Sequence, residues 1–126
     1  MIEKEFTSRE CSNPQSPITN LFEGIPVDLA EERFDTLLCL DAVRIERIVS
    51  AGQVTPEGEW YDQGGDEWIL LLAGCATLIL EGDHEPRLLT VGDCTLIPAH
   101  QQHRVEWTSP DEKTVWLAVH IGESRQ

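Results

Sequence analysis

The sequence predicts a single all-β domain, and two observations lead to that prediction. From Ile18 onward the chain is a series of short apolar stretches separated by turn-forming Gly, Pro, Asp and Ser residues, a rhythm typical of many short strands. Several of these stretches alternate between apolar and polar residues with the period of two that half-buried strands show. We therefore expect about eight strands or more, closed into a barrel or stacked in two layers, because either arrangement protects exposed strand edges.

The N-terminal segment differs from the rest of the chain. Residues 1–17 are polar, rich in Ser, Glu, Asn and Pro, and show no periodic apolar pattern. Such a composition buries too little apolar surface to order itself, which predicts a flexible tail. Residues 18–126 then form one barrel domain, in keeping with a chain of 126 residues.

Two strands are expected in the first part of the domain. In residues 43–49, alternate positions starting at 43 share one face, which is apolar except for Arg47. Residues 67–72 are apolar on both faces after Glu67, so this strand should be central and covered on both sides. Its outward apolar side chains are Trp68, Leu70 and Leu72. They predict a homodimer that pairs strand on strand, or cover from N-terminal strands.

Four further strands are expected in the second part of the domain. Residues 77–81 and 87–90 are joined by a polar segment and predict a hairpin. Residues 104–108 and 115–121 are rich in β-branched and aromatic side chains and predict two more strands.

Composition excludes several classes of partner and activity. The formal net charge of −14 disfavours nucleic acid and anionic membrane surfaces as partners. The chain has no apolar run of about 18 residues and its N-terminus lacks the features of a signal peptide, so we expect a cytoplasmic protein. No Ser, His and Asp constellation and no Gly-rich phosphate loop is present, which leaves hydrolase and kinase functions without support.

The candidate functional residues are polar side chains expected to face inward. Burying an ionisable group costs several kcal/mol unless the group is paired or binds a metal, so such residues are of interest. They are Arg47, Asp62, Glu67, His100, His103 and His120. These residues come from separate strands or turns that a barrel can bring to one mouth. His120 is expected to be a satisfied core or mouth histidine rather than a ligand.

Glu67 is followed after six residues by Gly74, and Gly92 is followed after five residues by Pro98 and then by His103. These two spacings resemble the paired motifs of the cupin family. The resemblance implies a double-stranded β-helix, or jelly-roll barrel. It also implies a divalent metal held by two histidines and a glutamate of the first motif and a histidine of the second.

The His-x-His pair of the first motif is absent from this chain. Counting back from Glu67, it falls on Trp60 and Asp62, or with a shorter loop on Tyr61 and Gln63. Only Glu67 and His103 match the family's metal ligands.

Two arrangements of the candidate site remain open at this point. In the first, Asp62, Glu67 and His103 bind Mn, Fe, Ni or Zn, and His100 is a fourth ligand if the turn at Pro98 bends the chain. In the second, no metal is bound, Glu67 pairs with Arg47 in the barrel mouth, and His103 donates a hydrogen bond to a carboxylate.

Two classes of function follow from these arrangements. An enzyme could be a metal-dependent dioxygenase in which Arg47 orients an anionic group, or a metal-free isomerase with His103 as base and Tyr61 as acid. Trp60 would narrow the cavity toward flat or aromatic ligands. The alternative is a non-enzymatic module that binds or senses a metabolite.

Overall fold

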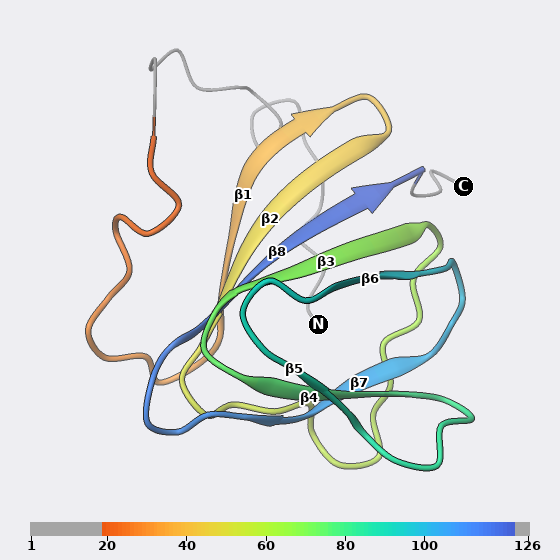
Figure 1. Cartoon of the computed structure of the whole chain (residues 1–126). Coiled ribbons are helices and arrows are strands. Elements are labelled where there is room, and N and C mark those ends of the chain that lie inside the picture. The colour runs from red at the N-terminus through yellow and green to blue at the C-terminus, as the bar shows by residue number, and fades with distance from the viewer. Residues whose placement is uncertain (1–18, 123–126) are drawn as a thin grey trace.

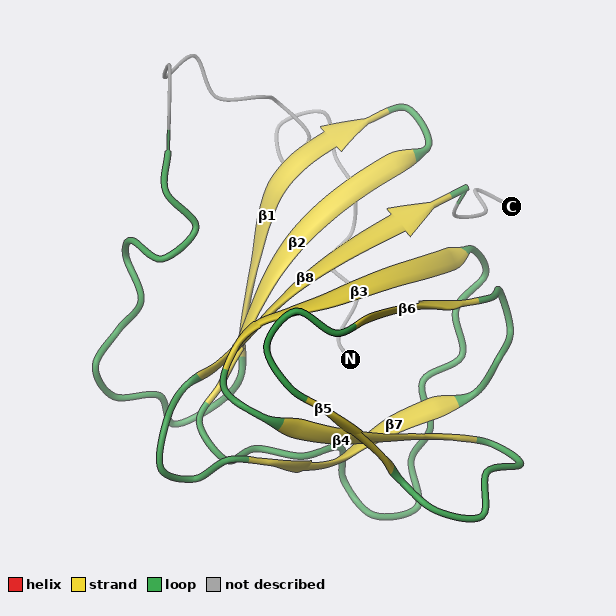
Figure 2. Cartoon of the chain, viewed as in Figure 1, coloured by secondary structure: helices red, strands yellow, loops and turns green. Residues whose placement is uncertain are grey.

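The computed structural model describes residues 19–122, and within them the chain folds into two antiparallel β-sheets that face each other (Figure 1, Figure 2). The strands are β1 (Arg33–Leu40), β2 (Val43–Ser50), β3 (Asp66–Ala73), β4 (Ala76–Leu80), β5 (Arg87–Leu89), β6 (Cys94–Ile97), β7 (His103–Thr108) and β8 (Thr114–Ile121). The described residues contain no helix that could cross a membrane. The predicted tail, residues 1–17, lies outside the described residues.

The sheet topology confirms the predicted all-β class. One sheet has five strands in the order β1-β2-β8-β3-β6, and the other has three in the order β5-β4-β7. Strands distant in sequence are neighbours, since β8 lies between β2 and β3. This placement brings residues from both ends of the domain to one barrel wall. As predicted from its two apolar faces, β3 is an interior strand of its sheet.

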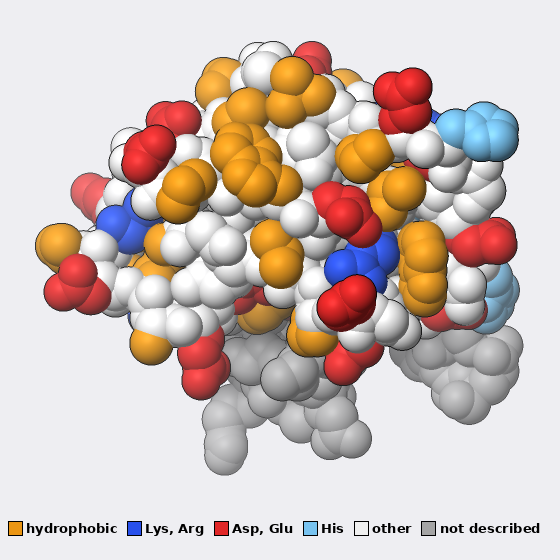
Figure 3. Space-filling model, turned by 90° about the horizontal axis from the view of Figure 1, so that it is seen from below, with side chains coloured by type: hydrophobic (Ala, Val, Ile, Leu, Met, Phe, Trp, Pro, Cys, Tyr) orange, Lys and Arg blue, Asp and Glu red, His pale blue; other side chains and the backbone are white. Residues whose placement is uncertain are grey.

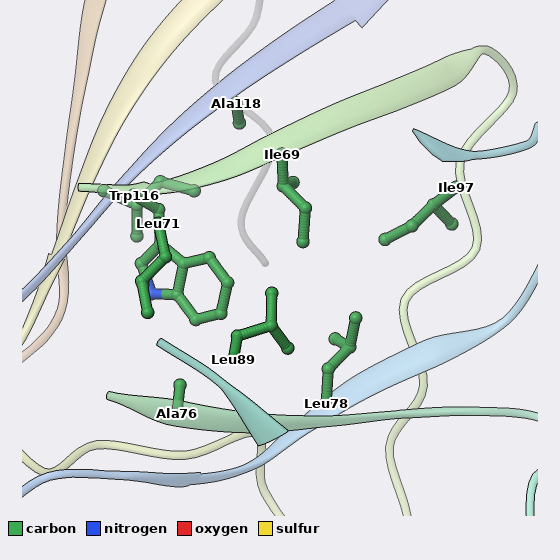
Figure 4. Close-up of a cluster of buried hydrophobic side chains, with 9 residues drawn as sticks. Ile69, Leu71, Ala76, Leu78, Leu89, Ile97, Trp116 and Ala118 are labelled. Carbon is green, nitrogen blue, oxygen red and sulfur yellow. The ribbon is translucent and has the colours of Figure 1, made fainter. Parts of the chain in front are cut away.

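The core lies between the two sheets, where the inward side chains interdigitate (Figure 4). Trp116 and Ala118 of β8, with Ile69 and Leu71 of β3, face Leu78 of β4 across the barrel. The other buried members of this cluster are Ile48, Ala76, Leu89 and Ile97. Burying such side chains contributes about 1.5–3 kcal/mol each, so the middle of the barrel holds the two sheets together.

The structure corrects the predicted orientation of β2. Ile48 belongs to the core, so its face, which also carries Arg44 and Glu46, is the inner one. Arg47 therefore lies on the outer face. There it donates hydrogen bonds to the Leu21 and Glu23 carbonyl oxygens at 2.8 and 2.7 Å and to Asp35 at 2.7 Å.

The predicted pairing of Arg47 with Glu67 in the barrel mouth is thus wrong. Burial raises the pKa of the Asp35 carboxyl, but the hydrogen bonds from Arg47 and Arg33 outweigh it, and the pKa lies below its usual value. Arg47 is a structural residue that ties the segment before β1 to the outside of the five-stranded sheet.

Candidate functional site

Polar side chains replace the apolar ones at one end of the barrel interior. Register places Glu67 of β3 opposite His120 of β8, and His120 opposite Arg44 of β2. All three side chains are buried, as are Glu46 of β2 and His103 of β7. Burying an ionisable group costs free energy unless the group has a partner. This cluster is therefore a candidate functional site.

A cavity of about 40 Å³ opens beside this cluster. Its lining is mainly apolar, with Phe34, Ile48, Ile69, Leu78, Ile97, Val105 and Trp116. The polar lining residues are Glu32, Tyr61, Glu67 and His103. A space of this size holds a few water-sized groups. Three of its polar lining residues, Tyr61, Glu67 and His103, are also candidates from the sequence.

Glu67 and His103 meet at the cavity wall. The Nε2 atom of His103 lies 3.4 Å from Oε1 of Glu67, and both side chains are only 6% exposed. The Nδ1 atom of His103 lies 2.9 Å from the carbonyl oxygen of Gln101. Within the described part of the chain, no hydrogen bond reaches Oε1 of Glu67. This buried carboxylate oxygen therefore has no hydrogen-bond partner among the described residues, and it faces both the cavity and an imidazole nitrogen.

The contacts of His103 with Gln101 and Glu67 determine how many protons the Glu67–His103 pair holds. A carbonyl oxygen only accepts, so Nδ1 of His103 carries a proton and donates it to Gln101. In a neutral ring, Nε2 would then present a lone pair to the ionised carboxylate of Glu67 at 3.4 Å. Two lone pairs that face each other in a buried site repel. The contact is favourable only when one proton sits on either Nε2 or the carboxyl group.

The loop before β3 places Tyr61 at the same cavity. Tyr61 and His103 exchange backbone hydrogen bonds of 2.8 and 3.1 Å, and their rings meet edge to face with centroids 5.6 Å apart. The Arg104 guanidinium donates to the carbonyl oxygens of Thr55, Pro56 and Glu59, which pins the loop to β7. The site is therefore built on strands and a fixed loop.

Glu32 adds a second carboxyl group to the cavity wall. Its Oε2 atom accepts a 2.7 Å hydrogen bond from the Ser50 hydroxyl. Burial raises the pKa of the Glu32 carboxyl, and the Ser50 hydrogen bond offsets this only in part. Sequence periodicity gave no sign of Glu32, because it lies in the irregular segment before β1.

His120 and Glu46 form a second buried pair behind Glu67. Both side chains are 1% exposed, and Nε2 of His120 lies 3.1 Å from Oε1 of Glu46. Burial lowers the pKa of His120, but the hydrogen bond to Glu46 and the charges of Glu67 and Glu46 outweigh it, so the pKa lies above its usual value. The expectation that His120 is a satisfied mouth histidine agrees with these contacts.

The four predicted metal ligands form two separate pairs. Asp62 and His100 contact each other at 3.1 Å on the surface, with side chains 44% and 74% exposed. Glu67 and His103 form the buried pair described above. Within residues 19–122, no three His, Cys, Asp or Glu side chains come together in a way that could hold a metal ion. The predicted four-ligand set therefore does not fit a metal in this arrangement.

Of the two ways to place the missing His-x-His pair, the shorter loop matches the structure. Tyr61 lines the cavity, and Gln63 contacts Nδ1 of His120 through its side-chain oxygen at 3.1 Å. Trp60 and Asp62 are exposed and do not line the cavity. Trp60 is thus poorly placed for the predicted role in ligand binding.

Comparisons with known proteins agree with this architecture. A model of the cupin domain matches residues 47–120. A solved structure from Ralstonia eutropha JMP134, provisionally assigned as a mannose-6-phosphate isomerase, shares 46% sequence identity with a TM-score of 0.81, covering 84% of this chain and 98% of that one. Among functionally curated proteins, no sequence matches this chain.

More distant structures share the fold alone. A cupin superfamily protein from Desulfitobacterium hafniense DCB-2 is 22% identical with a TM-score of 0.68, covering 86% of this chain and 94% of that one. The polyketide cyclase RemF from Streptomyces resistomycificus is 20% identical with a TM-score of 0.65, covering 77% of this chain and 69% of that one.

Proposed function

This chain belongs to the cupin domain family, and we propose that its barrel binds a small molecule and transfers a proton on it through Glu67 and His103. The observation that supports this proposal most strongly is the partnerless Oε1 atom of Glu67, which lies on an apolar cavity 3.4 Å from Nε2 of His103. A general acid or base must lie within reach of the proton it moves. This pair meets that condition for a ligand in the cavity.

Each residue has a distinct role in the proposed reaction. Glu67 accepts a proton from the ligand at its free oxygen, while His103, anchored through Nδ1 to Gln101, retains or returns the proton on Nε2. Tyr61, whose ring packs against His103, is the candidate acid on the ligand's other side. Removing a proton at one atom and returning one at a neighbouring atom is an isomerisation. The similar protein from Ralstonia eutropha is provisionally assigned to that reaction class.

The negative charge of the cavity wall and of the whole chain limits which kinds of ligand can bind. The cavity wall carries the carboxyl groups of Glu32 and Glu67, and the described residues that line it include no Lys or Arg. The chain has a net charge of −14, and acidic side chains are spread widely over the face in Figure 3. Such a field repels anions. We therefore propose a small uncharged or cationic ligand with a hydrogen-bond donor, and not a phosphorylated sugar.

A non-enzymatic binding module is the second candidate. The small volume of the cavity, about 40 Å³, favours it, because so little space leaves a bound molecule few ways to rearrange. The same pair would then serve only to hold the ligand through a hydrogen bond.

A ligand panel read by thermal unfolding tests the proposal. We expect small neutral polyols or amines to raise the melting temperature of the wild type, and mannose 6-phosphate to leave it unchanged. A ligand at about 100 times its dissociation constant adds roughly 2.7 kcal/mol to stability. Glu67→Gln should abolish the shift, and His100→Gln, which changes the exposed Asp62 pair, should preserve it. Stabilisation by the sugar phosphate that survives Glu67→Gln would contradict the proposed site.

Binding and catalysis can then be separated with the best ligand. In deuterated water, the wild type should exchange a ligand carbon-bound hydrogen for deuterium, as read by proton NMR, and His103→Gln should lose at least about 100-fold of that rate. Tight binding without exchange would identify the binding module instead.

The outer face of the five-stranded sheet supports the proposed homodimer. Trp68 of β3 is half-buried there, and its register partner Leu96 of β6 is 51% exposed. An apolar row of this kind favours association with a second copy. Light scattering should therefore give twice the chain mass for the wild type and the single mass for Leu96→Glu. A monomeric wild type at micromolar concentration would refute the dimer.

A further inference from the structure

The proposed reaction makes no direct use of His120, although its side chain is among the most deeply buried of residues 19–122. It lies on β8 between β2 and β3, and its backbone register partner on β3 is Glu67. It does not line the cavity. A 1% exposed histidine directly beside the acid–base pair therefore needs its own explanation.

Both ring nitrogens of His120 contact acceptor atoms. Nδ1 lies 3.1 Å from Oε1 of Gln63, and Nε2 lies 3.1 Å from Oε1 of Glu46. A carboxylate oxygen and an amide oxygen only accept hydrogen bonds. With the Gln63 oxygen facing Nδ1, as the structure places it, both ring nitrogens donate, and the ring is then the doubly protonated, positively charged imidazolium.

The charged groups around His120 include two carboxylates that favour its protonated form. Arg44 and Glu46 face it from β2, Glu67 faces it from β3, and His103 of β7 lies beyond Glu67. Ionised Glu46 and Glu67 carry two negative charges, and Arg44 supplies one positive charge. When the proton of the Glu67–His103 pair sits on His103, that ring adds a positive charge beyond Glu67. The two carboxylates that face His120 still favour its protonated form.

We propose that His120 is a buried imidazolium that acts as a positioning residue, holding Glu67 ionised so that the proton of the Glu67–His103 pair stays on His103. The effect passes through charge, since no hydrogen bond joins His120 to Glu67. Burial opposes the charged form of His120, but Glu46 and Glu67 favour it strongly enough that the net pKa is raised. Gln63 completes the arrangement by linking the loop that carries Tyr61 to the barrel wall. The inference rests on the acid–base role proposed above for Glu67 and His103.

NMR of the full-length protein, without ligand, tests this inference. With isotope-labelled protein near pH 7, long-range proton–nitrogen spectra should show His120 with both ring nitrogens protonated. Glu46→Gln removes one acceptor charge and should shift His120 toward the neutral ring. His120→Gln should shift the Glu67 carboxyl carbon signal toward the protonated form. His84→Gln, at an exposed loop, is the matched control and should change neither signal.

The outcomes distinguish this inference from the proposed function. A wild-type His120 ring with one bare nitrogen, accepting from the Gln63 amide, would overturn it. An unchanged Glu67 signal in His120→Gln would also overturn it, and if that variant does not fold, the Glu46→Gln spectrum decides. Neither measurement needs a ligand. A protein that binds none of the panel therefore argues against the proposed function while leaving the charge state of His120 to these spectra.

Discussion

Replacing Gly74 with Ala should lower the free energy of unfolding by about 2–5 kcal/mol. Gly74 lies between β3 and β4 with a φ of +86°, a backbone conformation that side chains other than glycine rarely adopt. A Cβ atom there would lie 2.5 Å from the Thr114 hydroxyl oxygen and 2.7 Å from the Lys113 carbonyl oxygen. The backbone around β8 would have to move, and β8 connects β2 with β3. Urea denaturation followed by tryptophan fluorescence measures the loss.

Gly82 is the matched control for this prediction. Its φ is +103°, but a Cβ atom added there would meet nothing within 4 Å. Gly82→Ala should therefore cost only the backbone strain, about 1–2 kcal/mol. Equal losses for the two variants would show that the close approach at Gly74 does not matter.

Breaking the buried Glu46–His120 pair should cost about 3–5 kcal/mol. His120→Leu leaves the ionised Glu46 in the interior without its partner, and Glu46→Leu leaves the imidazolium in the same position. The double variant removes both charges and should recover part of the loss. The difference between the double variant and the sum of the single variants measures the coupling.

The sign of the pH dependence follows from the raised pKa of His120. A histidine whose pKa is higher in the folded state stabilises the fold fully below its ordinary value of 6.5 and loses that contribution as the pH rises through the folded-state value. The stability gap between wild type and His120→Leu should therefore be larger at about pH 6 than at about pH 9. A gap that stays constant or widens with pH would contradict a charged His120.

Much of the fold could be predicted from the sequence, and the missed strands have physical reasons. The alternating and fully apolar runs that became β2, β3 and β8 gave clear signals because tertiary burial follows their period. Strand β1 was missed because a bulge between Thr36 and Leu38 shifts its register and breaks the alternation. Strand β6 spans only Cys94–Ile97, which is too short to show a period.

The candidate site was predicted in part. The spacing that resembles the cupin motifs identified Glu67 and His103, and the structure brings them to one cavity. The inner face of β2 was misassigned because the more apolar face was taken as inward, whereas Arg44 and Glu46 lie inside. Their partners come from β8 and from the loop before β3. Such pairings between distant segments are not encoded in local periodicity.

We propose that Glu67 and His103 share a proton and do not act as metal ligands. Dialysis of untagged protein against Zn²⁺, Mn²⁺, Ni²⁺ or Fe²⁺, followed by removal of free ion and elemental analysis, tests it most directly. Because the predicted metal ligands lie in two separate pairs, we expect no stoichiometric metal in the wild type. We expect the same result for Glu67→Gln and His103→Gln. One equivalent of retained metal per chain that both variants lose, and that the control His100→Gln keeps, would contradict it.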